Sequence, residues 1–299
     1  MLENAVGSVP VLYRRRDVSF EDFSSYWRDV HGVFVAGFLG PSRYRMLHFA
    51  PYDPDLWDND AVGRDLAEPR HLGGIAEFVF PNDISRFKWL NTVGTFADAD
   101  DAIVFRRSTS YSVSQNGFLA SKELDKQSDA DETGTRVFAM FKAATPQEAF
   151  RGYMTDVLSP ALAACSGVAH AQITLYDRYE TPSREFLGGA EVERFLAPDE
   201  QHQATLEILF KDHLALGHFF GSHWPKLQHE FAAHVAQVHA YRVKGAYTLI
   251  RDGKLTLAGW LGGTRANLVR RVNAMNIIEA LSAANAQRMS KAGMEQAVS

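Results

Sequence analysis

The sequence predicts an α+β protein in which two copies of a β-α-β-β-α-β unit follow one another along the chain. Short β-branched and aromatic runs alternate with segments of helical period, and the same order of elements occurs in both halves. A polar, acid-rich segment, residues 120–134, separates the halves. Each unit alone would leave one apolar face of its sheet bare, so we expect the two sheets to close into one intramolecular barrel with pseudo-two-fold symmetry.

The first half supplies four expected strands and two helices. The strands are Val9–Tyr13, Arg43–Phe49, His71–Phe80 and Ser108–Ser114, and the helices are residues 19–35 and Asp83–Val93. Ser19 is a suitable N-cap for the first helix, with Asp22 three residues later as its reciprocal partner. The second helix begins at Asn82 or Asp83, which are also capping residue types.

The second half repeats this order. Its expected strands are Val137–Phe141, Val168–Tyr176, Ala204–Phe210 and His239–Ile250, with a helix beginning at Thr145-Pro146 and a helical region over 213–235. Two long insertions, Asp53–Arg70 and Tyr179–Gln203, occupy corresponding places between the second and third strands of each half. Loops of this length are either binding loops or solvated excursions, and the sequence leaves both open.

The C-terminal segment is expected to form one amphipathic helix over Arg265–Met289, because apolar residues recur there at helical spacing. This helix would pack across the two repeats or against a second subunit in a homodimer. The sequence therefore divides into four parts: repeat 1 (1–119), a linker (120–134), repeat 2 (135–254) and a helical extension (255–299).

Composition narrows the class of protein. The 299 residues are 46% hydrophobic and 22% charged, which is typical of a soluble globular protein. A net charge of −5 without basic runs argues against a nucleic-acid or anionic-membrane partner, and no apolar run reaches the ~20 residues of a spanning helix. The single cysteine, Cys165, excludes an intrachain disulfide, and the N-terminus lacks the pattern of a secretory signal. We expect a cytoplasmic protein.

His31 is the leading candidate for chemistry. It shares one face of the first helix with aromatic residues at three- and four-residue steps: Phe20, Phe23, Trp27 and Phe34. Burial among aromatic rings disfavours the charged imidazole, which would keep His31 a neutral base near pH 7. The other interpretation is a hydrogen-bonded core histidine with no catalytic role.

The sequence resembles the EthD family in the string Phe23-x-x-Tyr26-Trp27-x-x-x-His31, the Gly40-Pro41 turn and the following Arg43-Tyr44. The resemblance covers residues 9–114 and, more weakly, 135–250. It implies the dimeric α+β barrel superfamily of ferredoxin-like domains, with His31 and Tyr44 as working residues of a pocket. That superfamily includes cyclases, isomerases, cofactor-free monooxygenases and haem enzymes, so the fold alone does not assign a reaction. Phe78 stands near the place of a cysteine in the muconolactone isomerase branch, which puts that particular isomerisation in doubt.

The strand Arg43–Phe49 alternates, so Tyr44 and His48 share one face. If that face looks into the barrel, His31, Tyr44 and His48 would converge on a ligand in the lumen. Glu77 in the third strand would orient His31, act as a base or pair with an arginine such as Arg43.

The remaining expected pocket residues come from several strands and one helix. They are Trp27, Tyr13, Phe78, Tyr111 and, from the second half, His170. Alignment of the halves places Leu158 where His31 stands, which predicts one working pocket, in the first half. The histidines of His213–His239 do not have the spacing of a metal site, and no glycine-rich nucleotide-binding loop is present. We therefore expect neither a metal nor a cofactor.

These observations together predict a cofactor-independent lyase, isomerase or cyclase that acts on a small aromatic or polyketide-like carbonyl compound. His31 would move a proton while Tyr44 hydrogen-bonds the resulting enolate. Three alternatives remain open at this point: a cofactor-free monooxygenase in the same pocket, a non-catalytic protein that binds a hydrophobic metabolite, and a haem enzyme.

Overall fold

We describe the protein from a computed structural model, which covers residues 5–57, 59, 61–122, 130–131, 135–179, 192–274, 276 and 280. Its strands are β1 (Val6–Arg14), β2 (Arg43–Phe49), β3 (Gly74–Phe80), β4 (Phe105–Val113), β5 (Phe118–Lys122), β6 (Ala130–Asp131), β7 (Arg136–Ala143), β8 (Val168–Leu175), β9 (Ala204–Phe210), β10 (Val235–Arg251) and β11 (Lys254–Leu255). Its α-helices are α1 (Phe20–Tyr26), α2 (Gly32–Ala36), α3 (Asp83–Val104), α4 (Gln147–Tyr153), α5 (Ser159–Ala164), α6 (His213–His218), α7 (Trp224–His234), α8 (Leu257–Leu261) and α9 (Gly263–Arg271).

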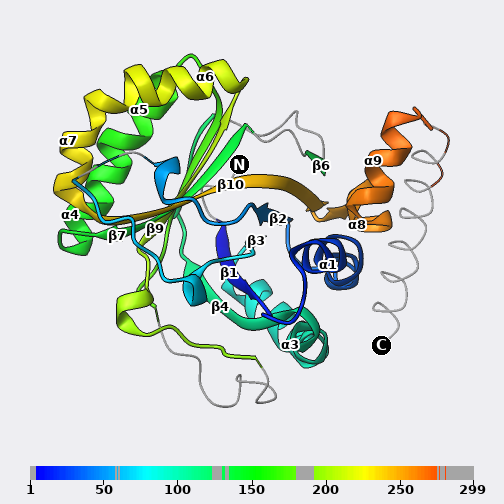
Figure 1. Ribbon diagram of the computed structural model, residues 1–299. Helices are drawn as coiled ribbons and strands as arrows, with labels where there is room; N and C mark the ends of the chain where they lie inside the picture. Colours follow the sequence, from blue (N-terminus) through cyan, green and yellow to red (C-terminus); the bar gives the residue numbers. More distant parts are fainter. Residues whose placement is uncertain are drawn as a thin grey trace.

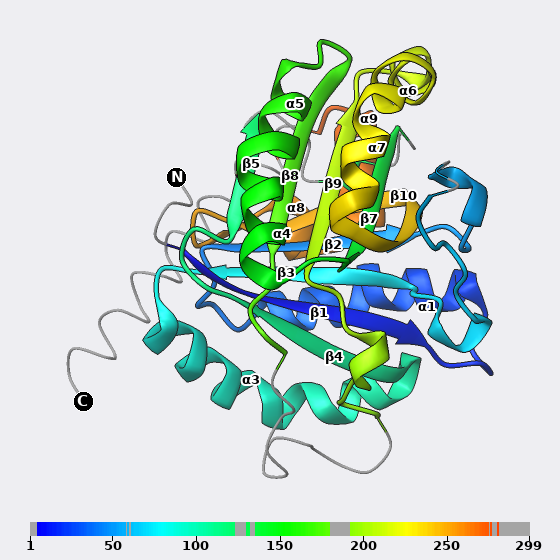
Figure 2. The ribbon, with the colours of Figure 1, turned by 90° about the vertical axis from the view of Figure 1, so that its left-hand side faces the viewer.

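The strands form one antiparallel sheet, in the order β4-β1-β3-β2-β10-β7-β9-β8-β5. The long strand β10 joins its two parts, because it pairs with β7 through its first half and with β2 through its second. Figure 1 shows the two groups of strands between two layers of helices, with α4–α7 on one outer side and α1 and α3 on the other. In Figure 2 the strands of the two groups cross at a steep angle. The expected α+β class and antiparallel pairing are confirmed.

The apolar core has three layers. One lies between the strands of the first half and their helices, and includes Trp27, Tyr44 and Phe78; we call it the first helix layer. A matching layer in the second half includes Phe150 and Leu158. The third cluster lies between the two halves of the sheet, where Phe49 packs on Phe138 and on Tyr241; we call it the inter-sheet core.

The two halves of the sheet also meet along a second seam, away from β10. There the N–H of Asp177, just after β8, donates to Ser112 of β4 at 2.9 Å. Glu193 exchanges backbone hydrogen bonds with Arg106 and Ser108 of β4 at 3.1 and 3.0 Å. The inter-sheet core is therefore bordered by main-chain hydrogen bonds on two sides, which shields its side chains from water.

The expected end of one helix is wrong. The second helix of the first half does not end at Val93 but continues to Val104, because the weakly amphipathic stretch after Thr92 still packs against β1 and β4. The expected first helix begins at Ser19, whose Oγ accepts from the N–H of Asp22, but it contains a π-helical turn over Trp27–His31. The expected linker 120–134 contributes the end of β5 and the short β6, and residues 123–129 and 132–134 of it lie outside the described residues.

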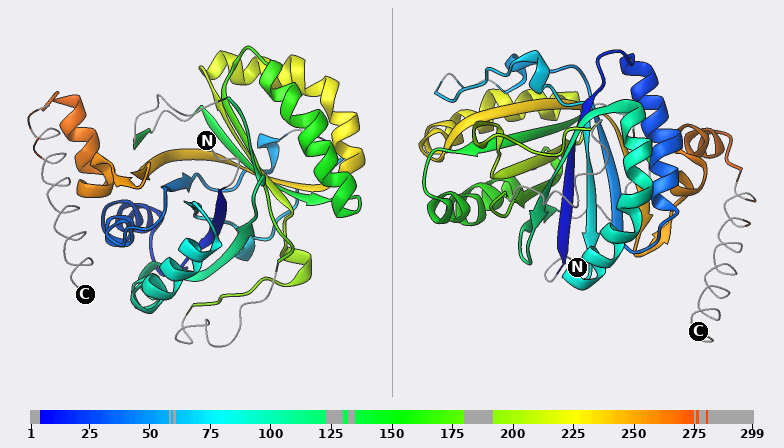
Figure 3. Two further views of the ribbon diagram at one scale, coloured as in Figure 1. Left: turned by 180° about the vertical axis from the view of Figure 1, so that it is seen from behind. Right: turned by 90° about the horizontal axis from the view of Figure 1, so that it is seen from below.

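The C-terminal helices α8 and α9 pack against the π-turn and α2, beyond the end of β10 (Figure 3). Thr264 donates its N–H and its hydroxyl to the carboxylate of Asp29 at 2.9 and 2.7 Å. The expected helix over 265–289 is interrupted early, since α9 ends at Arg271 and Asn273 takes the left-handed conformation (φ 52°) that commonly terminates a helix. Most of the expected helix beyond that point lies outside the described residues. Among the described helices, none is long and apolar enough to cross a membrane.

Candidate active site

His31 is the last residue of the π-turn in the first helix, and its side chain is almost fully buried. Its Nδ1 lies 2.5 Å from Oδ2 of Asp100, in the last turns of α3, and the Tyr26 hydroxyl donates to the other oxygen of Asp100 at 2.5 Å. Burial acts to raise the pKa of Asp100, but the hydrogen bonds from His31 and Tyr26 outweigh it and hold that pKa below its ordinary value. Asp100 is therefore an ionised carboxylate that fixes the imidazole ring.

A second carboxylate lies on the other side of the ring. Oδ1 of Asp101 is 3.8 Å from Nε2 of His31, while its Oδ2 accepts from Arg194 at 2.7 Å. Arg194 comes from the second half of the chain, from the segment between β8 and β9, so both halves contribute to the surroundings of His31. The ring of Phe105 meets His31 edge-on at 5.3 Å between centroids. Nδ1 is thus engaged by Asp100, whereas Nε2 has the more distant carboxylate of Asp101 beside it.

Tyr44 lies on β2 and faces the same first helix layer as His31. Its ring stacks on Phe78 at 4.3 Å, and its buried hydroxyl has no hydrogen-bond partner among the described residues. Burial raises the pKa of Tyr44 far above its ordinary value, and the negative charge of Asp101 adds to this rise. Tyr44 therefore stays protonated, and its hydroxyl can donate a hydrogen bond to a ligand.

His48, two residues further along β2, lies in the same layer. Its ring stacks on Trp27 at 4.0 Å, and its Nδ1 is 2.9 Å from the hydroxyl of Ser24. His48 Nε2 and Trp27 Nε1, like the Tyr44 hydroxyl, are buried atoms without a partner in the described part of the chain. Buried polar atoms are nearly always satisfied in native proteins, so three such atoms in one layer indicate that a ligand or water completes it.

Burial of His48 makes a testable contribution to the pH dependence of stability. Burial, reinforced by the charge of Arg28, lowers the pKa of His48 to about 3, whereas the unfolded chain binds a proton near pH 6.5. The unfolded state is therefore favoured as the pH falls from 6.5 towards 3, and the loss for this one histidine is about 3 kcal/mol at pH 4.

We expect His48→Gln to have a shallower dependence of the unfolding free energy on pH between 7 and 4 than the wild type. Urea unfolding at several pH values measures this slope. His229→Gln, on the exposed side of α7, is the matched control and should keep the wild-type slope. Equal slopes in wild type and His48→Gln would contradict the buried neutral state of His48.

The structure corrects which face of β2 meets the barrel interior. His31, Tyr44 and His48 do share one space, but it lies between the sheet and the helices, not in the lumen between the two halves of the sheet. The opposite face of β2 looks into the inter-sheet core, where Leu47 packs and Arg45 is buried. Alternation predicts which residues share a face; it does not say which face is inward, because both are buried.

Glu77 lies in the inter-sheet core and not beside His31, so it neither orients that ring nor serves as its base. As the sequence suggested, it pairs with Arg43, at 2.8 Å, and it also accepts from Gln172 at 2.7 Å. Arg45 crosses the core to bind both oxygens of Glu207 at 2.7 and 3.0 Å. These paired side chains fill the space between the sheets and leave a cavity of only about 10 Å³.

The other expected pocket residues are scattered. Phe78 and Trp27 belong to the first helix layer with His31. His170 lies near Glu207, whose pKa its charge helps to lower, and Tyr111 stacks on Tyr176 at 4.2 Å in the inter-sheet core. Tyr13 lines a cavity at the end of that core. We call His31 and its two carboxylates, Asp100 and Asp101, the His31 cluster. Tyr13, Tyr111 and His170 lie apart from this cluster, in or beside the inter-sheet core.

The second half lacks the His31 cluster, although its first helix contains a π-helical turn at the same place. A π-turn over Met154–Leu158 ends on a buried leucine where the first half has His31. The helix of each half that follows its third strand is capped by Asn82 in the first half and by Asp212 in the second. When the two helices are aligned on these caps, the exposed Glu230 corresponds to Asp100. Only the first half therefore brings a histidine and a carboxylate together at this place.

Comparison with known proteins was informative for the fold. No family profile and no curated protein matches the sequence. A solved structure from Fusobacterium nucleatum, described as a candidate monooxygenase, is 10% identical and covers 83% of this chain and 95% of its own, with a TM-score of 0.51. An anthrone oxidase-like protein is 10% identical, covers 82% of this chain and 93% of its own, and also has a TM-score of 0.51. The likeness to both structures covers most of each chain and shows a shared overall fold.

Proposed function

We propose that this chain is a cofactor-independent enzyme that moves a proton on a small aromatic or polyketide-like carbonyl compound, with His31 as the base. The observation that carries the proposal is the contact of His31, buried on a π-helical turn, with the half-buried Asp100 of α3, whose Oδ2 is 2.5 Å from Nδ1 of the ring. π-turns within α-helices are frequent at functional sites. A carboxylate on Nδ1 fixes the ring with Nε2 directed away from it, and stabilises the imidazolium that forms when Nε2 accepts a proton.

Tyr44 would complete the site. When Nε2 removes a proton from a carbon beside a carbonyl group, negative charge develops on the carbonyl oxygen. The unpartnered Tyr44 hydroxyl is a protonated donor in the same layer, and it would bind that oxygen. Return of the proton to another carbon gives an isomer, and attack of the enolate on a second carbonyl gives a ring or, in reverse, a fragment.

The repeated order of elements supports a further part of the proposal. We infer that residues 1–119 and 135–254 are two ferredoxin-like repeats, and that pairing of their sheets within one chain replaces the pairing of two subunits in a dimeric barrel. The second repeat would serve as scaffold and supply Arg194 to the site of the first.

A second candidate function is a cofactor-free monooxygenase in the same site. It is favoured by the descriptions of the two structural neighbours as a candidate monooxygenase and an anthrone oxidase-like protein. Its first step is the same proton transfer, after which the carbanion gives electrons to O₂ instead of taking up a proton. The two functions therefore differ in whether turnover consumes O₂.

The experiment is an incubation of the protein in D₂O with acetylacetone, resorcinol and anthrone, in air and under nitrogen. Mass spectrometry detects deuterium uptake and new products, and an oxygen electrode detects consumption of O₂. Deuterium uptake under nitrogen is expected of both functions, because they share the first proton transfer. New products under nitrogen support the lyase, isomerase or cyclase, and products formed only in air with consumption of O₂ support the monooxygenase. Binding without turnover in either gas would leave a binding protein as the function.

Tyr44→Phe tests the donor separately. We expect turnover to fall about 10²-fold, as when one oxyanion donor is removed, while the free energy of unfolding changes by less than about 1 kcal/mol because the hydroxyl has no partner to lose. Rates and urea unfolding measure the two effects. Tyr153→Phe removes a comparable unpartnered hydroxyl from the second half and should leave the rate unchanged. Unaltered turnover in Tyr44→Phe would remove Tyr44 from the mechanism.

A further inference from the structure

A cleft of about 420 Å³ opens at one end of the inter-sheet core, away from the His31 cluster. Its walls come from the Asp53–Arg70 insertion, the end of β7, the start of β10 and the turn Pro198–Glu200. A smaller cavity of about 20 Å³ continues inward and shares four lining residues with the cleft: Leu66, Arg70, Lys142 and His239. The two long insertions that the sequence marked as binding loops or excursions thus meet at one opening.

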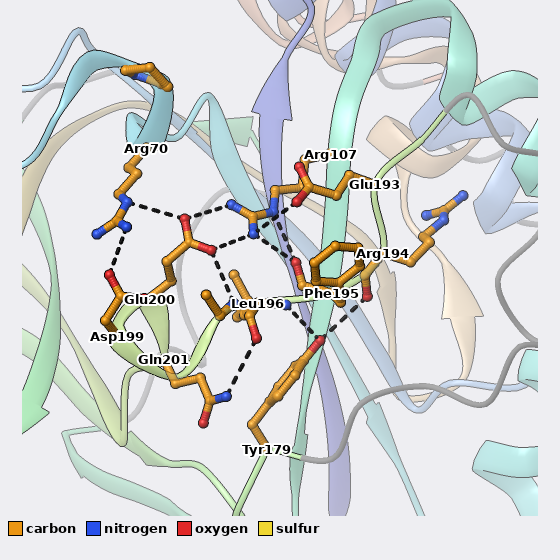
Figure 4. A network of polar contacts seen from close by, with 12 residues as sticks. Arg70, Arg107, Tyr179, Glu193, Arg194, Phe195, Leu196, Asp199, Glu200 and Gln201 are labelled. Atoms are coloured by element: carbon orange, nitrogen blue, oxygen red, sulfur yellow. Dashed lines mark hydrogen bonds and ion pairs between the residues drawn. The ribbon is translucent and has the colours of Figure 1, made fainter.

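The insertion from the second half is held firmly at this opening. Glu200 binds Arg107 of β4 through both oxygens, at 2.9 and 2.5 Å, and Arg70 of the other insertion at 3.2 Å (Figure 4). Arg70 also pairs with Asp199 at 2.7 Å. These ion pairs join the two insertions to each other and to the sheet, so the cleft is built before any ligand enters.

The floor of the cleft carries a buried histidine. His239 is 2% exposed, and its Nδ1 lies 2.9 Å from Nε2 of His202. Its Nε2 makes no well-formed hydrogen bond with a described residue, although the backbone carbonyl of Asp65 lies near the ring. His239 lines both cavities. An unsatisfied nitrogen at this depth is expected to meet a polar group of a ligand or a water.

The cleft is lined by two cations, Arg70 and Lys142, and by two carboxylates, Asp65 and Asp199. Burial lowers the pKa of His239 to about 4, and the cations Lys142, Arg70 and the nearby His71 lower it further, against the carbonyl of Asp65. Arg70 is already ion-paired, whereas Lys142 hydrogen-bonds only the backbone carbonyl of Asp199 among the described residues. Burial and the charge of Arg70 also lower the pKa of Lys142. The carboxylates of Asp199 and Glu200 act to raise that pKa, but neither forms an ion pair with the Lys142 ammonium in the described part of the chain.

The inner walls are largely aromatic and aliphatic. Tyr13, Tyr241, Leu72 and Met140 line the smaller cavity, and the Tyr241 hydroxyl is already engaged as the acceptor of the Leu72 N–H at 3.3 Å. This inner cavity holds little more than a water, whereas the cleft itself has room for a ring and presents Leu66, Ala67, Ala143 and Ala236 to it. An occupant therefore needs one anionic group for Lys142 and His239 and an apolar body that lies in the cleft.

We propose that this cleft is a second binding site, which takes a small aromatic or aliphatic carboxylic acid. The carboxylate lies between the Lys142 ammonium and Nε2 of His239, and the apolar body occupies the cleft of about 420 Å³, against Leu66 and Ala143. A lone carboxylate in water is well hydrated, so the affinity comes from pairing it with an ammonium group that forms no ion pair within the described part of the chain, together with burial of the apolar part.

Calorimetric titration of the full chain with benzoate and 1-naphthoate tests this site, with benzamide as the uncharged analogue. We expect both acids to bind and benzamide to bind at least about tenfold more weakly, because it lacks the charge-assisted contact. Lys142→Met and His239→Gln should each weaken benzoate binding about tenfold or more. Lys211→Met, which removes an exposed lysine outside the cleft, and His31→Gln should leave it unchanged.

Absence of binding by either acid, or benzoate binding that is the same in wild type and Lys142→Met, would overturn the proposal. Because His31→Gln keeps this site intact, the outcome is independent of the function proposed for the His31 cluster. Equal affinity for benzoate and benzamide would likewise overturn it, since the site would then recognise the ring and not the anion.

Discussion

Replacing His31 by Gln is expected to lower turnover by about 10²- to 10⁴-fold, the contribution of a positioned general base. Gln keeps a similar size and can still hydrogen-bond Asp100, so the ring contacts with Phe105 are the main packing loss. The rate is measured on whichever of the tested carbonyl compounds the wild type consumes, and circular dichroism and urea unfolding measure the fold.

The control for this prediction is His229→Gln, at an exposed position of α7 in the second half. It changes the same side chain without touching the first helix layer and should retain the wild-type rate. A variant His31→Gln that folds normally and keeps its rate within about twofold of the wild type would show that His31 is a core histidine held by Asp100, and not a base.

The second large effect is expected in stability. Glu207→Gln should lower the free energy of unfolding by about 3–5 kcal/mol, the cost of breaking a buried ion pair on one side. Glu207 accepts two hydrogen bonds from Arg45 and also pairs with Arg136, and all three side chains are at most 5% exposed. Loss of its charge leaves two buried guanidinium groups with less compensation. Urea unfolding with an unchanged m-value measures the loss.

Asp17→Asn provides the comparison on the surface. Asp17 pairs with Arg15 at 2.5 Å, but both side chains are substantially exposed, and such pairs contribute little. We expect its unfolding free energy to change by less than about 1 kcal/mol. Arg45 comes from the first half and Glu207 from the second, so their buried ion pair joins the two halves. Losses of similar size in Glu207→Gln and Asp17→Asn would contradict a stabilising role for this pair.

The order and class of the elements could be predicted from the sequence, since period-2 and helical patterns and the Ser19 cap are local properties. The extension of α3 to Val104 could not, because the stretch around Gly94 and Thr95 is not amphipathic and its helix depends on packing against the sheet. A helix that ends at Val93 excludes Asp100 and Asp101, so the sequence did not indicate them as partners of His31. A helix continued through the acidic run 98–101 places both carboxylates on the layer that also contains the first helix.

The face of β2 was the other misassignment, and its cause is the architecture. A strand with helices on one side and a second sheet on the other is buried on both faces, so burial does not distinguish Tyr44 from Arg45. One signal was present: a face with two arginines needs buried carboxylates, and Glu77 and Glu207 stand at corresponding places in the third strand of each half. Arg194 could not be assigned, because its contact with Asp101 depends on how the second half folds back.

The measurement that tests the central claim most directly is deuterium exchange at the acidic carbon of acetylacetone or anthrone in D₂O under nitrogen, with wild type and His31→Gln at equal concentration. If His31 is the base, the wild type accelerates exchange above the buffer rate and His31→Gln does not. Equal acceleration by both proteins, or none by a wild type that demonstrably binds the compound, would contradict proton transfer at His31.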